Sequence, residues 1–278
     1  MIQYRLAQVI GGKGATPDRF AAALHGVAVD ARGQVYAAGD AEVKVFSSSG
    51  ELKRRWPTSK PGFSVAVAGD GSVYVGQAGQ IEFFDGAGKL ITTWRGAQLL
   101  GPVTAIGFVK DGVLAADAAD RAIRRFDRGG KFVNDIGKDN RMKGFRIPNG
   151  VVDFGVDSGD VIHAANPGRH RVERYTPDAV LLGHFGRFDG IDPAGFPGCC
   201  NPTNVAVAGH DGIVVTEKAG PRAKLYHFDG TLAAVIASDA FDPNCKNMDV
   251  AADPGGRVYI ADTVKLTVNV FEPVRGGG

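Results

Sequence analysis

The stretch that decides the fold is "GGRVYIADTVKLTVNVFEP", residues 255–273. It contains two short runs rich in β-branched and aromatic residues, "VYIADT" (258–263) and "LTVNVFEP" (266–273), on either side of a polar turn. Short runs of this composition, bounded by turn residues, are typical of paired β-strands. The same pattern occurs earlier in the chain, so this stretch is one copy of a repeat.

The other copies are easy to align on their strand-like runs. Runs equivalent to "VYIADT" begin at residues 35, 73, 113, 161 and 213. A following strand ends in each copy on an aromatic residue: Phe46, Phe84, Phe126, Tyr175, Phe228 and Phe271. Copies of four short strands at a spacing of roughly 40–50 residues are the signature of a β-propeller. We therefore predict an all-β fold, a six-bladed β-propeller with four-stranded antiparallel blades.

The two ends of the chain predict how the ring closes. The last copy has no fourth strand after "LTVNVFEP", whereas the N-terminus has a spare strand-like run, "YRLAQVIG" (4–11). An unpaired edge strand invites aggregation. We therefore expect residues 1–10 to complete the last blade, so that residues 1–278 form a single propeller domain. Trp56 and Trp94 end the fourth strands of consecutive copies, a spacing that predicts packing between blades.

Composition narrows the class of protein. With 278 residues, 44% of them hydrophobic, the chain can bury a large core. A formal net charge of +2 gives no reason to expect a nucleic-acid or membrane partner. No run approaches the roughly 20 continuous apolar residues of a membrane span. The start "MIQYRLAQVIGG" has the pattern of a strand rather than a signal peptide. We expect a cytoplasmic monomer, or a periplasmic one if a signal peptide has been removed.

Two longer stretches resemble a known repeat. They are "PNGVVDFGVDSGDVIHAANPGRHRVERY" (148–175) and "MDVAADPGGRVYIADTVKLTVNVF" (248–271), and both are similar to NHL repeats. The resemblance covers essentially the whole chain and implies the propeller fold. It does not imply one function, because NHL propellers serve as enzymes, as protein-binding platforms and as RNA-binding modules.

The cysteines suggest a site at one end of the propeller. Cys199 and Cys200 lie in "GFPGCCNPTNVAV" (195–207), and Cys245 lies in "DPNCKNMDVAAD" (242–253). Loops that lead into the inner strands of a propeller open on one face. Aligning "NVAVAG" with "MDVAAD" places Cys245 opposite Asn201, one step from Cys200. We therefore predict that the three thiols converge at one mouth of the central tunnel.

Three thiolates suit a soft metal. Copper(I) is favoured in a trigonal sulfur site, and zinc would need a fourth ligand. His25, Asn201 and Asn204 are predicted to lie close enough to be additional ligands or their hydrogen-bond partners. Two alternatives remain open at this point: a disulfide between Cys245 and one of the adjacent pair, or three buried and inert thiols.

Basic residues are expected around the same mouth. Loops between second and third strands contain Arg169, Lys218 and Arg222, our candidates for catalytic residues, together with His170 and Lys265. Positive surroundings lower the pKa of thiols and attract anions. These residues are therefore predicted to bind a small anionic molecule.

A second resemblance suggests a different metal. The stretch "IPNGVV" (147–152) is similar to the Pro-Asn-Gly segment of gluconolactonase-like six-bladed propellers, which hold calcium in the tunnel with Asn, Asp and Glu. The resemblance implies that Asn149, Asp153, Asn204 and Asp249 could face inward as calcium ligands. A peptidyl-hydroxyglycine lyase would need several tunnel histidines for zinc, and only His25 is suitably placed.

Two classes of function follow. The first is a copper-thiolate enzyme, an oxidoreductase or lyase, that acts on a small anionic or sulfur-containing molecule at the tunnel mouth. The second is a non-catalytic platform that binds a protein, or less readily an RNA, through its basic face.

Overall fold

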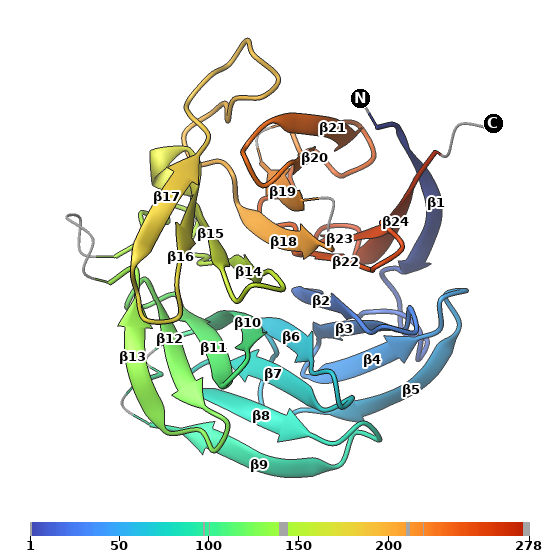
Figure 1. The fold of residues 1–278 in the computed structure, drawn as a ribbon. Coiled ribbons are helices and arrows are strands. Elements are labelled where there is room, and N and C mark those ends of the chain that lie inside the picture. The colour runs from blue at the N-terminus through green and yellow to red at the C-terminus, as the bar shows by residue number, and fades with distance from the viewer. Residues whose placement is uncertain are drawn as a thin grey trace.

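The computed structural model describes residues 2–96, 98–99, 101–138, 144–209, 212–218 and 220–274. Within these ranges the chain forms six four-stranded antiparallel sheets arranged as blades around a central tunnel (Figure 1). The predicted all-β, six-bladed propeller is confirmed. The described residues contain no helix that is long and apolar enough to cross a membrane.

Each blade runs outward from the tunnel through four strands. The innermost strands are β2 (Gly26–Val29), β6 (Ser64–Val67), β10 (Val103–Val109), β14 (Phe154–Val156), β18 (Asn204–Ala208) and β22 (Val250–Ala252). The second strands are β3 (Val35–Gly39), β7 (Val73–Gln77), β11 (Gly112–Asp117), β15 (Ile162–Asn166), β19 (Gly212–Glu217) and β23 (Val258–Asp262). The third strands are β4 (Glu42–Phe46), β8 (Gln80–Phe84), β12 (Ala122–Asp127), β16 (Arg171–Tyr175), β20 (Arg222–Tyr226) and β24 (Thr267–Pro273). The outer strands are β5 (Leu52–Pro57), β9 (Leu90–Arg95), β13 (Phe132–Ile136), β17 (Leu181–Phe185), β21 (Leu232–Ala237) and β1 (Tyr4–Gly11).

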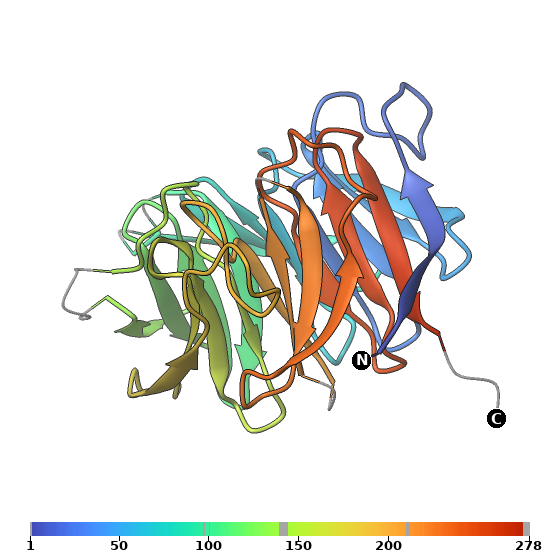
Figure 2. The same ribbon diagram turned by 90° about the horizontal axis from the view of Figure 1, so that it is seen from above.

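The N-terminal strand completes the last blade, as predicted. Strand β1 pairs antiparallel with β24, from Tyr4 opposite Pro273 to Gly11 opposite Thr267, with a bulge between Leu6 and Gln8. Figure 2 shows the blue N-terminal strand alongside the red C-terminal one. Because the first and last strands belong to one sheet, opening the ring at this blade would break a whole ladder of backbone hydrogen bonds.

Aromatic residues join neighbouring blades through turn glycines. Trp56 packs against Phe84 of the next blade and Trp94 against Phe126, with ring centroids 5.8 and 6.1 Å apart. The turn after Phe84 contains Gly88, whose φ of +90° places the position of a Cβ atom only 2.5 Å from the Trp56 ring. The predicted role of both tryptophans in packing between blades is thus confirmed.

One closing aromatic was predicted at the wrong position. Strand β20 ends at Tyr226, which pairs with Ile213 as Phe271 pairs with Val258. Phe228 lies two residues further on, within the turn that the hydrogen bond from Gly230 N to His227 O closes. The segment "YHF" offers two aromatic residues, and the earlier one is fully buried.

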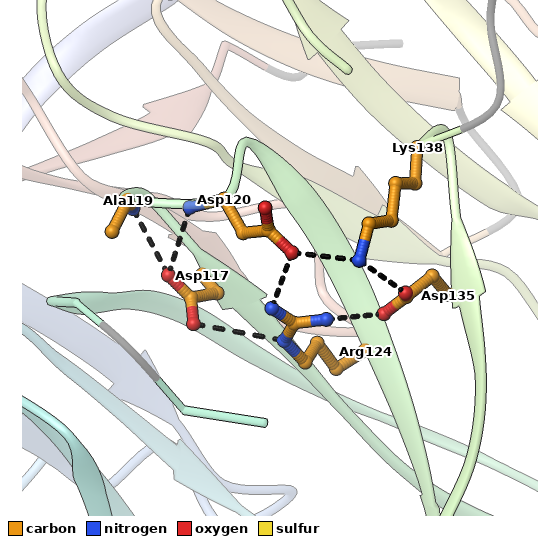
Figure 3. A network of polar contacts seen from close by, with 6 residues as sticks. All are labelled: Asp117, Ala119, Asp120, Arg124, Asp135 and Lys138. Atoms are coloured by element: carbon orange, nitrogen blue, oxygen red, sulfur yellow. Dashed lines mark hydrogen bonds and ion pairs between the residues drawn. The ribbon is translucent and has the colours of Figure 1, made fainter. Parts of the chain in front are cut away.

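The third strands carry a feature that sequence analysis did not detect, a buried polar side chain in every blade. These residues are Lys44, Glu82, Arg124, Glu173, Lys224 and Asn269. Figure 3 shows the network around Arg124, whose guanidinium lies 2.6 Å from Asp120 and 2.5 Å from Asp135. Lys138 bridges the same two carboxylates from the solvent side. A buried charge is tolerated only when it is paired in this way.

The contact between Trp56 and Gly88 can be tested with a matched pair of glycines. Gly71 has nearly the same φ as Gly88, +86° against +90°, but nothing lies within 4 Å of its Cβ position. Both alanine variants strain the backbone, whereas only Gly88→Ala also displaces the Trp56 ring. We expect Gly88→Ala to lower the free energy of unfolding by about 1–3 kcal/mol more than Gly71→Ala, measured by denaturant titration. Equal losses would show that the aromatic contact does not contribute.

Candidate functional site

The tunnel contains polar space at one end and apolar space further in. At the mouth where loops lead into the inner strands lies a cavity of about 220 Å³. Its polar lining consists of His25, Thr104, Asn149, Asn204, Asn247, Asp249 and Thr263. A smaller space of about 60 Å³ adjoins Asp153 and Asp249. A space of about 320 Å³ further along is lined by apolar residues of all six inner strands.

In five of the six blades a polar side chain occupies the same position at the start of the inner strand. Strand pairing places Gly26, Ser64, Thr104, Asp153, Asn204 and Asp249 at or next to the first residue of each inner strand. We call the last five the polar ring. Gly26 is required in the first blade, because a Cβ atom there would lie 2.8 Å from the Ser64 backbone.

The polar ring fastens each blade to a neighbour. Ser64 Oγ donates to Val103 O at 2.8 Å, and Thr104 Oγ1 donates to Val152 O at 2.7 Å. The Asp153 carboxylate accepts from Val205 N at 3.0 Å. The Asp249 carboxylate accepts from Val27 N at 2.7 Å, and this bond joins the last blade to the first.

Both carboxyl groups of the ring have raised pKa values. Burial raises the pKa of Asp249 to about 7, against the hydrogen bonds from Val27 N and Val250 N that favour its ionised form. Burial and the charge of Asp249 raise the pKa of Asp153 well above its ordinary value. Two adjacent carboxyl groups without a cation between them cannot both be ionised cheaply, because each charge is removed from water and repels the other.

Two amide oxygens at the mouth lack a hydrogen-bond donor. Asn149 Oδ1 and Asn204 Oδ1 are buried, and no side chain or backbone group of the described ranges donates to them. Asn149 is oriented by its Nδ2, which donates to Asn247 Oδ1 at 3.0 Å. The Asn204 side chain forms a hydrogen bond with Asp153. Both amide groups are therefore held in place by hydrogen bonds that leave their Oδ1 atoms without a donor.

His25 lies on the same cavity, where sequence analysis placed it. Its ring stacks on Phe63 with centroids 5.5 Å apart and an interplanar angle of 28°. Burial lowers the pKa of His25, against the opposing effect of Asp40. The imidazole is therefore neutral at pH 7 and able to accept a proton or bind a cation.

The structure separates the three cysteines that the alignment brought together. Cys199 and Cys200 are in contact, with their Sγ atoms 2.7 Å apart. Cys245 instead packs in the core with Phe241 and Met248, and its Sγ accepts from Thr263 N at 3.3 Å. Among the described residues, no group of three or more His, Cys, Asp or Glu side chains could hold a metal ion. The structure therefore does not show the predicted three-sulfur cluster, and metal binding by the cysteines stays a prediction.

Asn201 has a structural role in the loop that holds the adjacent pair. Its Nδ2 donates to Pro197 O and Lys218 O at 2.7 and 2.9 Å, while its Oδ1 accepts from Lys218 N at 2.8 Å. These three hydrogen bonds hold the loop in place. The predicted role of Asn201 next to a metal stays a prediction.

The predicted basic rim is largely a set of counterions. Arg222 donates from Nε to the fully buried Glu217, and Arg169 lies 3.9 Å from the buried Glu173. Their charges balance the buried carboxylates of Glu217 and Glu173, which occupy ordinary strand positions in the sequence. Lys218 differs from them, because its side chain forms a hydrogen bond with the Cys200 thiol. A catalytic role for Lys218, Arg222 or Arg169 stays a prediction.

Sequence analysis identified Asn149, Asp153, Asn204 and Asp249 as inward-facing residues but missed Thr104, Asn247 and Thr263. The repeated position at the start of the inner strands was the available signal for Thr104. Asn247 and Thr263 lie in loops of the last blade, and only the folded ring brings them to the mouth.

Comparisons with known proteins define the fold alone. No family model and no curated protein matches this chain. Similar solved structures include a streptogramin B lyase, with 13% identity over 93% of this chain and 81% of the other, at a TM-score of 0.64. Virginiamycin B lyase from Staphylococcus aureus has 13% identity over 99% and 90%, at 0.59. The WD40 propeller domain of Doa1 has 15% identity over 97% of both chains, at 0.63. The similarity to NHL repeats accordingly remains a resemblance.

The raised pKa of Asp249 predicts how stability depends on pH. Between about pH 4 and 7 the folded protein keeps a proton on this group that the unfolded chain releases, so stability falls as pH rises. We expect Asp249→Asn to remove up to about 4 kcal/mol of this fall, measured by denaturant unfolding with divalent cations chelated. Asp111→Asn, at an exposed turn, is the control and should keep the wild-type profile. An unchanged profile for Asp249→Asn would contradict the assignment.

Proposed function

We propose that the mouth cavity binds a hard divalent cation, Ca²⁺ in the first instance, through Asn149, Asn204 and Asp249. We further propose that the protein is an enzyme that acts on a small polar or anionic molecule at this cation, as a lyase or hydrolase. The observation that carries the proposal is the convergence of two buried, donor-free amide oxygens and a carboxyl group on one cavity.

The donor set fits such an ion. A buried acceptor without a partner costs about 1–3 kcal/mol, and a cation would remove this penalty at both asparagines. Calcium takes oxygen ligands, including carboxylates and amide carbonyls, and completes its coordination with water or substrate. Asp153 lines the small space next to Asp249, and a bound cation would favour the ionised forms of both carboxyl groups. Apart from the His25 imidazole, the cavity lining lacks the sulfur and imidazole ligands that zinc and copper prefer.

When bound, the cation would act as a Lewis acid that polarises a carbonyl or similar oxygen of the bound molecule. The chain's own residues supply the rest of the site. Neutral His25 can accept a proton from the molecule, and its stacking on Phe63 fixes the ring. Asn247 orients the Asn149 amide. Phe63, Pro102 and Val151 supply an apolar wall that keeps water away from part of the ligand.

Two of the similar folds are lyases by name, the streptogramin B and virginiamycin B lyases. At 13% identity they support this proposal only by showing that a propeller of this kind can serve as a lyase. The copper-thiolate enzyme has weaker support, because only two of its three sulfurs are in contact. No observation on the described surface favours the protein-binding or RNA-binding platform.

Calorimetric titration of chelator-treated protein with Ca²⁺ tests the proposal. We expect about one equivalent to bind, and Asn149→Ala and Asn204→Ala each to weaken binding at least tenfold, since each removes an oxygen ligand. Asn134→Ala is the matched control, because Asn134 lies on the outer strand β13 and its Nδ2 donates to Pro177 O in a turn of the next blade. Unchanged affinity in both tunnel variants would overturn the site.

The same titration with Cu(I) and Zn²⁺ separates the competing hypotheses. If metal binding is lost in Cys199→Ser and Cys200→Ser but kept in Asn149→Ala, the metal site lies at the thiols and not in the tunnel. Binding of Ca²⁺ that is independent of all three cysteines supports the tunnel site.

A further inference from the structure

We propose that Cys199 and Cys200 are a redox-active vicinal dithiol that closes reversibly to a disulfide by exchange with a small disulfide such as oxidised glutathione. This is a thiol modification site outside the tunnel cavity, and it is independent of the proposed cation.

The geometry of the pair carries this inference. The two Sγ atoms of these free cysteines lie 2.7 Å apart, so they are in direct contact but not joined, because a disulfide bond is about 2.05 Å long. Cys199 is exposed, whereas Cys200 is only 2% exposed. A reagent can therefore reach one sulfur, and the second sulfur is already in place to attack the product.

The surrounding loop holds the pair and brings a cation to it. Asn201 fastens the backbone on the C-terminal side of the pair to Lys218 through two hydrogen bonds. The Lys218 side chain forms a hydrogen bond with the Cys200 thiol. The contact with Cys200, followed by the charge of Lys218, lowers the pKa of the Cys199 thiol. Burial raises the pKa of Cys200. Cys199 is thus the attacking thiol and Cys200 the resolving one.

The exchange balances in two steps. The Cys199 thiolate attacks one sulfur of glutathione disulfide, a mixed disulfide forms, and one glutathione leaves as a thiolate that takes up a proton. The Cys200 thiolate then attacks Cys199 Sγ and releases the second glutathione. The protein loses two electrons and two protons, and one glutathione disulfide becomes two glutathione molecules.

A disulfide between adjacent residues closes a small strained ring, and strained or exposed disulfides are the readily reduced ones. Strain therefore argues against a permanent structural bond but favours a reversible one. Cys245 is expected to be less reactive than this pair. Its thiol is buried, accepts a hydrogen bond from Thr263 N, and has a pKa that burial raises.

The experiment treats the reduced full chain with glutathione disulfide, quenches with acid and measures the intact mass. We expect wild type and Cys245→Ser to lose two hydrogens without retaining glutathione. Cys200→Ser should retain one glutathione on Cys199, and Cys199→Ser should react at least tenfold more slowly. Trypsin should release both cysteines in one peptide, residues 188–218, separate from Cys245.

Three outcomes would overturn the proposal: glutathione that stays on Cys199 in wild type, a bond that includes Cys245, or no reaction of wild type. A second probe does not depend on oxidation. Phenylarsine oxide bridges two close thiols, so it should bind one equivalent of wild type and of Cys245→Ser, but not of either single variant of the pair. Asn149→Ala should behave as wild type in both assays, which separates this site from the tunnel.

Discussion

The hydrogen bond from Val27 N to the Asp249 carboxylate is the contact on which the ring depends at its centre. It joins the last blade to the first beside the tunnel, while the pairing of β1 with β24 joins the two ends of the chain at the rim. Each blade on its own exposes two apolar sheet faces, and only a closed ring covers them all. The inner bond fixes the distance between the end blades, and the outer ladder prevents them from separating.

The same bond explains why the candidate site lies where it does. Polar groups are needed at the start of each inner strand to satisfy the backbone of the neighbouring blade, so Ser64, Thr104, Asp153 and Asp249 point into the junctions around the tunnel. Serine and threonine perform this task without charge on one side of the ring, where the first blade has Gly26 at the equivalent position. On the other side Asp153 and Asp249 perform it, and together with the donor-free Asn204 Oδ1 they bring several oxygen atoms to that side of the tunnel. The groups that meet this structural requirement are thus the oxygen donors on which the proposed cation site is built.

How far the sequence predicts this arrangement depends on whether the signal is local. Strand composition and turn residues are local and repeated, so the six blades, the closing strand and the inward position of Asn149 and Asp249 could be predicted. Loop paths are not local. An ungapped alignment placed Cys245 beside Cys200, but Cys245 turns toward Thr263 of its own blade. Ion pairs between a strand and the loop beside it could not be predicted either. Glu217 and Glu173 occupy ordinary strand positions, and only the folded structure shows that Arg222 and Arg169 neutralise them.

One of the proposed oxygen donors, Asn204, lies in the same continuous segment of blade five as the two adjacent thiols, yet the structure fastens the backbone between them. Between Cys200 and Asn204, Thr203 N donates to Thr216 O at 2.8 Å, and Thr216 Oγ1 donates to Met248 O at 2.9 Å in the next blade. Asn201 anchors the other end of this short connection to Lys218. A change in the bonding of the two sulfurs would have to break these backbone contacts before it could move the Asn204 amide. Rigid strands on both sides make the exposed loop the cheaper place for such a change, so thiol chemistry can proceed there while the tunnel oxygens keep their positions.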